Sequence, residues 1–324
     1  MKTNLNKRIM AYDLKFLNLS LGCDIVWKHI LSRTINSDID WNRGIMKIKV
    51  LIIGANSALA KDVKEQLEKD SFEIITASRH DSDLNIDVDK PFHIPEYIDV
   101  AINFAALFAS KSDNDYRKII DTNIKGVINT CIACKHVKHL IQISSLSALL
   151  KTNNPYFSDY AITKKCADEL AKYYCKLNNI NLTILKPSQI YGNRPEFKKN
   201  QPLFYTILEK LNNGKDVDIY GTNNAKRNYI NSLDLAEIIK RVIKQSVYGE
   251  FTCSYPENIK ILDIAQTAKN VFNKGGSINF VKEKPDITDN IFDYDDSLYK
   301  IINYVPQIDL KKGIEMWKEY QKVQ

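Results

Sequence analysis

The sequence has few cysteines, and their spacing excludes two common kinds of stabilising site. Six cysteines among 324 residues show neither a disulfide framework nor the spacing of a zinc site. Cys131 and Cys134 form a single C-x-x-C pair, and no second pair is present to complete a metal site. This pattern predicts small apolar thiols in a reduced, cytoplasmic protein that holds no metal.

Long hydrophobic runs are also missing. No stretch approaches about eighteen uncharged apolar residues, so we expect no segment that spans a membrane. The N-terminus has no apolar core followed by a small-residue cleavage site, which argues against a secretory signal.

Charge of one sign is not concentrated anywhere in the chain. Lysine and arginine number 46 against 39 aspartates and glutamates, which gives a net charge of +7. The basic residues are scattered among acids and form no long run, so we expect no nucleic-acid partner. A mildly positive surface instead suits an anionic small substrate.

From Met46 onwards, predicted strands and helices alternate. Strands are predicted at 48–53, 73–77, 98–104, 139–144 and 181–186, and helices at 58–69, 114–135 and 158–178. Such alternation predicts an α/β fold with a Rossmann-like, doubly wound parallel sheet.

The chain is predicted to have three parts. Residues 1–45 carry no motif and form an N-terminal extension of unknown role, whereas residues 46–186 form a Rossmann-like domain. Residues 187–324 form mostly a smaller C-terminal lobe that binds substrate, with some segments returning to the Rossmann domain. Further helices in this part are predicted near 203–212, 233–245 and 260–272.

The turn after the first strand, Gly54–Ala60, has only one of the three glycines typical of a dinucleotide-binding turn. Ser57 replaces the second glycine, and its hydroxyl is a possible donor to a phosphate. Ala60 replaces the third, which normally serves helix–strand packing. A strand that runs through a glycine into a helix still predicts a pyrophosphate site at the helix N-terminus.

No acidic residue stands at the end of the second predicted strand, where a ribose-binding carboxylate would favour NAD. Ser78 and Arg79 stand there instead. A serine and an arginine suit a 2′-phosphate, so we favour NADP over NAD, although a solvated loop arginine is the alternative.

Tyr160 is the one tyrosine with a lysine four residues later, Lys164. On a helix this spacing places both side chains on one face. An ammonium beside a phenol favours the phenolate, which would let Tyr160 exchange a proton near neutral pH. A hydrophobic strand ends at Ser144 and Ser145, fifteen residues before the tyrosine.

In this order, the motifs resemble those of extended short-chain dehydrogenase/reductases, of the sugar-nucleotide epimerase/dehydratase/reductase group. The resemblance covers about residues 46–324 and implies that residues 46–186 form an NAD(P)-binding Rossmann domain. Its remaining motifs are Asp87-Val88, Asn103-Phe104-Ala105-Ala106, the asparagine Asn123, the Lys186–Gly192 segment and the Gly221–Asp234 segment.

The resemblance implies roles for particular residues. The predicted catalytic residues are Ser145, Tyr160 and Lys164, with Ser147 as a second candidate for the serine. The residues expected to bind the cofactor are Gly54, Asn56, Ser57, Ala58, Leu59, Ser78, Arg79, Asp87, Val88, Phe104, Ala105, Ala106, Asn123, Tyr160, Lys164 and Pro187. Ser145, Gln189 and Arg227 are expected to bind the substrate, although Arg227 could instead pair with Asp234.

The same resemblance implies NADPH-dependent reduction of a 4-keto sugar nucleotide, in which Tyr160 transfers the proton. Leu146 and Ser147 replace the Asp-Glu pair that performs elimination in 4,6-dehydratases, so a dehydratase is not expected. An NAD-dependent sugar-nucleotide 4-epimerase and a non-catalytic dinucleotide-binding sensor or interaction module remain alternatives. The family also implies a homodimer and a place in polysaccharide precursor synthesis.

Overall fold

The computed structural model describes residues 39–40, 45–108, 113–222 and 224–323. The chain divides into two units, Met1–Lys47 and Ile48–Gln324. In the first unit, the described residues form an antiparallel pair of short strands, β1 (Ile39–Asp40) and β2 (Ile45–Met46). The rest of the predicted N-terminal extension lies outside the described residues.

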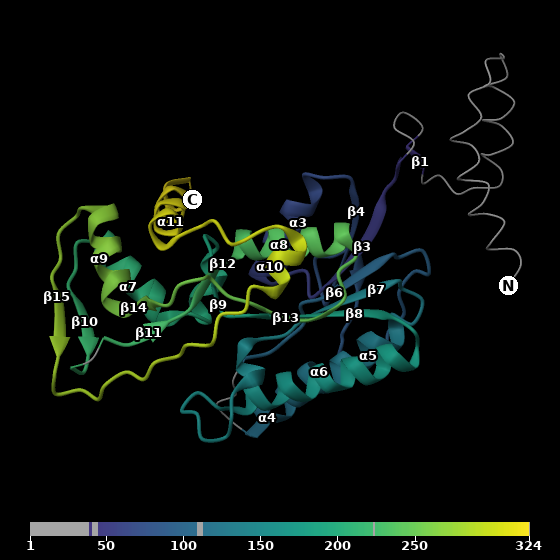
Figure 1. The fold of residues 1–324 in the computed structure, drawn as a ribbon, viewed down its shortest axis with the longest axis horizontal. Coiled ribbons are helices and arrows are strands. Elements are labelled where there is room, and N and C mark those ends of the chain that lie inside the picture. The colour runs from purple at the N-terminus through teal and green to yellow at the C-terminus, as the bar shows by residue number, and fades with distance from the viewer. Residues whose placement is uncertain (1–38, 41–44, 109–112, 223, 324) are drawn as a thin grey trace, which may run out of the picture. The chain divides into compact units, whose positions relative to one another are not determined.

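A seven-stranded sheet with the order β13-β8-β7-β6-β3-β4-β5 forms the centre of the second unit (Figure 1). All its strand pairs are parallel. The strands are β3 (Ile48–Ile53), β4 (Phe72–Ser78), β5 (Leu84–Asn85), β6 (Val100–Asn103), β7 (His139–Ile143), β8 (Asn181–Pro187) and β13 (Gly249–Cys253). The predicted Rossmann-like α/β fold is therefore confirmed.

The hydrophobic run of β3 explains its central place in this sheet. Val50 and Ile52 belong to the core on one face, whereas Leu51 and Ile53 belong to the core on the other. Because successive side chains of a strand point to opposite faces, a stretch covered on both sides, such as residues 50–53, is apolar at successive positions.

Helices cover both faces of the sheet (Figure 1). One face carries α3 (Ala58–Glu68) and α8 (Ser232–Gln245), whose apolar side chains join the first core. The other face carries α5 (Gly126–Ala133) and α6 (Asp159–Leu177). The helix predicted at 114–135 is interrupted, since a π-helical turn, Asp121–Lys125, separates α4 (Asp113–Ile120) from α5.

The remaining elements are short strands and helices of the C-terminal part. The strands form three two-stranded sheets, β12-β9, β10-β15 and β11-β14. These elements are β9 (Gln189–Tyr191), α7 (Pro202–Asn212), β10 (Val217–Tyr220), β11 (Lys226–Arg227), β12 (Tyr229–Asn231), β14 (Ile259–Lys260), α9 (Ile261–Phe272), β15 (Ile278–Val281), α10 (Ser297–Ile302) and α11 (Leu310–Val323). Two 3₁₀ helices, Leu146–Leu149 and Pro195–Lys199, complete the list.

Asp234, in the first turn of α8, fastens the segment between α10 and α11. Its Oδ1 accepts hydrogen bonds from the hydroxyl of Tyr304 at 2.6 Å and from the backbone N–H of Gln307 at 2.9 Å. Its Oδ2 accepts one from the backbone N–H of Ile308 at 2.9 Å. The carboxylate is buried and so is Ile308, whose N–H has no solvent to replace the lost acceptor, whereas Tyr304 and Gln307 are partly open to water.

We therefore predict that Asp234→Ala destabilises the protein by on the order of 3 kcal/mol, because buried donors left without an acceptor each cost about 1–3 kcal/mol. Urea unfolding followed by circular dichroism measures the free energy of unfolding. Asp216→Ala is the matched control, since exposed Asp216 also accepts a backbone N–H bond, from Ser277. Its loss is expected within about 1 kcal/mol, and equal losses for both variants would contradict the assignment.

Candidate active site

Three polar side chains meet where strand β7 ends and helix α6 begins. Ser145 follows β7 and caps the 3₁₀ helix after it, accepting a hydrogen bond from the backbone N–H of Ser147 at 3.1 Å. Tyr160 and Lys164 lie in the first two turns of α6, which begins after its capping residue Ser158. The hydroxyl of Ser145 is a hydrogen-bonding neighbour that lowers the pKa of the Tyr160 phenol. The structure thus brings Ser145, rather than Ser147, against the tyrosine.

The ammonium of Lys164 is held inside the protein. Only 3% of this residue is exposed, and its Nζ donates to the carbonyl of Ile143 at 2.8 Å. The same Nζ lies 5.9 Å from the ring centroid of Tyr160. Burial lowers the pKa of Lys164 to about 8, against an opposing effect of the Asp168 carboxylate.

Tyr160 departs from the expected behaviour of a phenol beside an ammonium. Burial raises its pKa, the hydrogen bond from Ser145 only partly offsets this effect, and the charge of Asp168 adds to it. The ring of Phe108 also stacks on that of Tyr160, with 4.4 Å between centroids and 11° between planes. Desolvation therefore outweighs the effect of Lys164 that the spacing predicted, and the group is a neutral phenol at neutral pH.

Gly54 shows why the first glycine of the turn is required. Its φ of +78° lies in the left-handed region. A Cβ at this position would lie 2.8 Å from the backbone nitrogen of Ala105, so the end of β3 passes directly against the end of β6. Any side chain here would force these two backbones apart.

The two replaced glycines are accommodated by other means. Ser57 caps α3, since its Oγ accepts a hydrogen bond from the backbone N–H of Ala60 at 3.3 Å. Ala60 is fully buried and belongs to the core between α3 and the sheet. Ala58 and Leu59 form the first turn of α3, which carries no acidic residue. A helix N-terminus without a nearby carboxylate remains suited to an anionic phosphate.

Asn123 organises the loop that follows β6. Its Oδ1 accepts a bond from the N–H of Leu107 at 2.8 Å, and its Nδ2 donates to the carbonyl of Leu107 at 2.9 Å. The same Nδ2 lies 3.1 Å from the hydroxyl of Thr163 on α6. Phe104, Ala105 and Ala106 precede Leu107, so Asn123 fixes their exit from the sheet relative to the helix that carries Tyr160.

The end of β4 carries the predicted 2′-phosphate residues. Ser78 is the last residue of this strand, and Arg79 is exposed just after it. Arg79 makes no ion pair or hydrogen bond with the part of the chain that the structure describes. Asn56 of the turn reaches the same place, since its Nδ2 donates to the carbonyl of His80 at 2.8 Å. The turn and the end of β4 therefore form one edge.

Asp87 and Val88 lie on the segment after β5. The carbonyl of Val88 accepts a bond from Asn129 of α5 at 2.7 Å, and its side chain packs against Gly126. A Cβ at Gly126 would lie 3.0 Å from Val88 Cγ2, so the glycine lets α5 approach this segment closely.

The predicted substrate residues come together through parallel pairing of β9 with β12. Gln189 pairs with Tyr229, two residues after Arg227. The Nε2 of Gln189 donates to Gln201 at 2.9 Å, whereas its Oε1 is buried without a partner in the described part of the chain. Pro187 ends β8, immediately before this segment.

Arg227 does not pair with Asp234, so that alternative is wrong. One nitrogen, Nη1, donates to the carbonyls of Lys226 at 2.9 Å and Thr288 at 2.5 Å. The other, Nη2, donates to the hydroxyl of Tyr156 at 2.7 Å, and the guanidinium carbon lies 5.2 Å from the centroid of the Tyr156 ring. Asp234 is already occupied by Tyr304 and its neighbours.

The residues fit a dinucleotide along this edge. Strands β3, β6 and β7 are neighbours, so Gly54, Ala105 and Ser145 emerge side by side at their carboxyl ends. Ligands of open α/β sheets bind at such edges. The close backbone approach at Gly54 and the N-terminus of α3 suit a pyrophosphate, and Lys164, bonded to the carbonyl of Ile143, holds α6 against the same edge.

Sequence reasoning missed three residues that shape this site. Phe108 and Tyr156 lie in loops, and no periodic signal marked them. Asp168 stands one turn after Lys164, a spacing that the sequence displays, but its burial against the site depends on strand β8. Among the described residues, no group of acidic, histidine or cysteine side chains is arranged to hold a metal, and no helix is long and apolar enough to cross a bilayer.

Several known proteins are similar to this chain in sequence or in fold. Protein CapI of Staphylococcus aureus is 22% identical over 295 residues, covering 81% of this chain and 86% of that protein. The dTDP-4-dehydro-6-deoxy-D-allose reductase of Streptomyces bikiniensis is 22% identical over 158 residues, 48% of each protein. The crystal structure of UDP-glucuronic acid 4-epimerase from Bacillus cereus in complex with NAD superposes with a TM-score of 0.69 at 19% identity, covering 85% of this chain and 99% of that one.

A family model identifies the family to which the chain belongs. The model of the NAD dependent epimerase/dehydratase family matches residues 50–252, which include the glycine turn, Ser145, Tyr160 and Lys164. The resemblance and the enzyme class predicted from the motifs are confirmed. The chain therefore belongs to the NAD dependent epimerase/dehydratase family and is an enzyme of the NAD(P)-dependent short-chain dehydrogenase/reductase type.

Proposed function

We propose that this enzyme reduces a 4-keto sugar nucleotide with NADPH and that Ser145, Tyr160 and Lys164 carry the reaction. The observation that carries this proposal is that Ser145, after the end of β7, and the buried Lys164, one turn further along α6, both act on Tyr160 from opposite elements of the site. Leu146 is buried and Ser147 has no acid–base character, so the site lacks the pair that an elimination requires. The setting, cytoplasmic synthesis of polysaccharide precursors, is part of this proposal.

The chemistry assigns each side chain a role. The cofactor, when bound, supplies the hydride that reduces the carbonyl carbon. Tyr160 donates its proton to the carbonyl oxygen, which suits its raised pKa because the phenol is protonated at neutral pH. Ser145 donates a hydrogen bond to the same oxygen and stabilises its developing negative charge. Lys164 stabilises the phenolate that remains.

Arg79 bears on the choice of cofactor, and Arg227 bears on the choice of substrate. The absence of an acidic residue at the end of β4, together with the exposed Arg79, favours NADPH over NADH. Arg227 and Gln189 are proposed to face the nucleotide diphosphate, with Tyr156 holding the Arg227 guanidinium. The name of the Streptomyces relative, a reductase of a dTDP-4-dehydro sugar, agrees with this proposal. The named epimerase neighbour keeps an NAD-dependent 4-epimerase as the second candidate.

We also propose a homodimer, formed by the outer faces of α4 and α6. Tyr116 and Ile120 are exposed one turn apart on α4, and Ile162, Tyr173 and Leu177 form an exposed stripe along α6. Residues at these intervals share one face of each helix. Apolar stripes on adjacent helices mark an interaction surface, and a second copy of the chain would cover both at once.

Stoichiometry tests the reaction. With a panel of 4-keto sugar nucleotides, we expect one NADPH to be consumed per product molecule, measured by absorbance at 340 nm and mass spectrometry. Tyr160→Phe should lower kcat by on the order of 10²–10⁴-fold, since it removes the proton donor. Tyr299→Phe is the matched control, because it also removes a buried hydroxyl, bonded to the Ser254 carbonyl, but should keep kcat within about twofold. Turnover of a 4-epimer pair without net NADPH consumption would instead establish the epimerase.

Arg79→Ala tests the cofactor preference. Loss of a charge-assisted fork to the 2′-phosphate should weaken NADPH binding by roughly tenfold to a hundredfold and leave NADH binding unchanged. Fluorescence titration of both cofactors measures the ratio. Lys64→Ala serves as the control for lost positive charge, since exposed Lys64 pairs with Glu68 on the same helix. An unchanged ratio in Arg79→Ala would remove the argument for NADPH.

The dimer is tested by mass in solution. Light scattering after gel filtration should give about twice the chain mass of 37.3 kDa for the unaltered protein and about 37 kDa for Tyr173→Glu/Leu177→Glu. Ile301→Glu, on α10, is the control, because Ile301 is also exposed but lies outside the stripe. A monomeric unaltered protein, or dissociation by the control variant alone, would refute this interface.

A further inference from the structure

A chain of buried and half-buried charges runs from the catalytic lysine toward the surface. Asp168 stands one turn after Lys164 on α6 and is only 1% exposed. Its Oδ2 lies 3.1 Å from the Nζ of Lys186 on β8, which is 4% exposed. Lys186 also pairs with Glu250 of β13, and Glu250 pairs with Lys172 of α6 at 2.5 Å. We call Asp168, Lys186, Glu250 and Lys172 the ion-pair chain.

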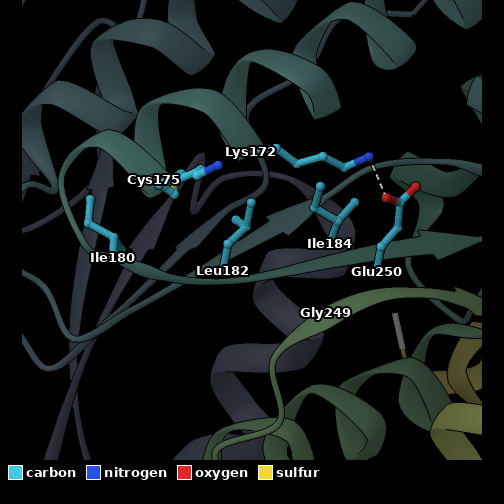
Figure 2. Close-up of a pocket in the computed structure, with 8 residues that line it drawn as sticks. Lys172, Cys175, Ile180, Leu182, Ile184, Gly249 and Glu250 are labelled. Atoms are coloured by element: carbon cyan, nitrogen blue, oxygen red, sulfur yellow. Dashed lines mark ion pairs between the residues drawn. The ribbon is translucent and has the colours of Figure 1, made fainter.

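The outer end of the ion-pair chain is visible in Figure 2, where Lys172 reaches from α6 across to Glu250. Both residues border a pocket of about 300 Å³ between α6 and the sheet edge formed by β8 and β13. The pocket contains no predicted site residue. The pocket opens Glu250 and Lys172 to solvent. Asp168 and Lys186 lie deeper and are almost fully buried.

Asp168 joins the three elements that carry the reacting groups. The hydroxyl of Ser144, next to Ser145, donates to its Oδ2 at 2.8 Å. Lys186, next to Pro187, binds the same oxygen. Asp168 itself continues the helix that carries Tyr160. One carboxylate therefore fixes the end of β7, the end of β8 and α6 relative to one another.

The second oxygen, Oδ1, is fully buried and accepts no hydrogen bond within the described residues. Burying a carboxylate with one unsatisfied oxygen costs folding free energy, so packing alone does not explain why a charged group stands here. Burial raises the pKa of Asp168, and the charge of Lys186 is the largest effect that opposes this and favours the ionised form. Asp168 in turn opposes the loss of protons from both Lys164 and Tyr160.

We infer that Asp168 is a positioning residue that keeps the Lys164 ammonium charged and the Tyr160 phenol protonated, the form that a reduction requires. The inference rests on the proposed function for its catalytic meaning. The charged and titratable groups around Lys164 are Tyr160 and Asp168 on its own helix, Lys186 on β8 and, beyond it, Glu250 on β13. Among these carboxylates, Asp168 is the one whose charge favours the protonated form of Lys164.

The direct test is the titration of Lys164 itself, measured by NMR of protein labelled with ¹³C at lysine Cε and assigned with Lys164→Arg. In the unaltered protein we expect a midpoint near the pKa of about 8. Asp168→Asn keeps the acceptor for Ser144 but removes the negative charge. It should lower the midpoint by about 1 pH unit, and the alkaline limit of reductase activity should move to lower pH with it.

Variants of Lys186 and Glu250 separate an electrostatic role from a structural one. Lys186→Gln removes the charge that favours ionised Asp168, so Asp168 takes up a proton more readily and the Lys164 midpoint should fall, as in Asp168→Asn. Lys186→Arg keeps that charge and should leave the midpoint near its unaltered value. Glu250→Gln lies beyond Lys186 and is partly exposed, so it should move the midpoint by less than about 0.3 pH unit. If Asp168→Asn does not fold, the contrast between Lys186→Gln and Lys186→Arg still decides the matter.

The outcomes are distinguishable from failure of the proposed reaction. An unchanged Lys164 midpoint in Asp168→Asn and Lys186→Gln, or equal shifts in Lys186→Gln and Lys186→Arg, would overturn the inference even if Tyr160→Phe is inactive. Full reductase activity of Tyr160→Phe would overturn the proposed catalytic roles, whatever the titration of Lys164. A midpoint that falls in both charge-removing variants but not in Lys186→Arg, together with an inactive Tyr160→Phe, supports both.

Discussion

The burial of the Lys164 ammonium is the constraint on which the rest of the site depends. Taking a lysine out of water favours its neutral form, so the surrounding protein has to supply compensation. A carbonyl at the end of β7 supplies one hydrogen bond, and Asp168 supplies charge. Both come from elements that also carry reacting groups. The requirement to hold one cation therefore aligns β7 with α6, and Asp168 ties β8 to both through Lys186.

The cofactor edge obeys a steric constraint rather than an electrostatic one. Gly54 is required because β3 and β6 end in near contact there, at a backbone angle that favours glycine. Neither of the other two turn positions carries that requirement. Ser57 uses its side chain to cap α3, and Ala60 fits the packed interface with the sheet. The irregular turn is thus compatible with an intact dinucleotide site, which weakens the argument for a non-catalytic sensor.

The sequence was sufficient for the sheet and for the pairing of Tyr160 with Lys164, because both follow from local periodicity. It was insufficient wherever distant segments decide the outcome. The π-helical turn around Asn123 could not be predicted from the sequence, because it depends on contacts with distant segments. In the fold, the Asn123 side chain is hydrogen-bonded to both Leu107 and Thr163. The rise in the pKa of Tyr160 likewise depends on burial that only the assembled fold creates. The hydrogen bond from Arg227 to Tyr156, 71 residues earlier in the chain, also exists only in the assembled fold.

The Rossmann domain and the segment that follows β9 are held as one framework by a buried carboxylate of α3. Asp62 accepts bonds from Arg194 at 2.6 Å and from Ser232, the first residue of α8, at 2.5 Å. Since α3 begins at the cofactor turn and Arg194 closely follows Gln189, Asp62 links the two binding edges directly. A hydride and a proton have to reach one carbonyl group together, and small misplacements are costly to such reactions. A rigid link between the edges that hold the two reactants meets that requirement.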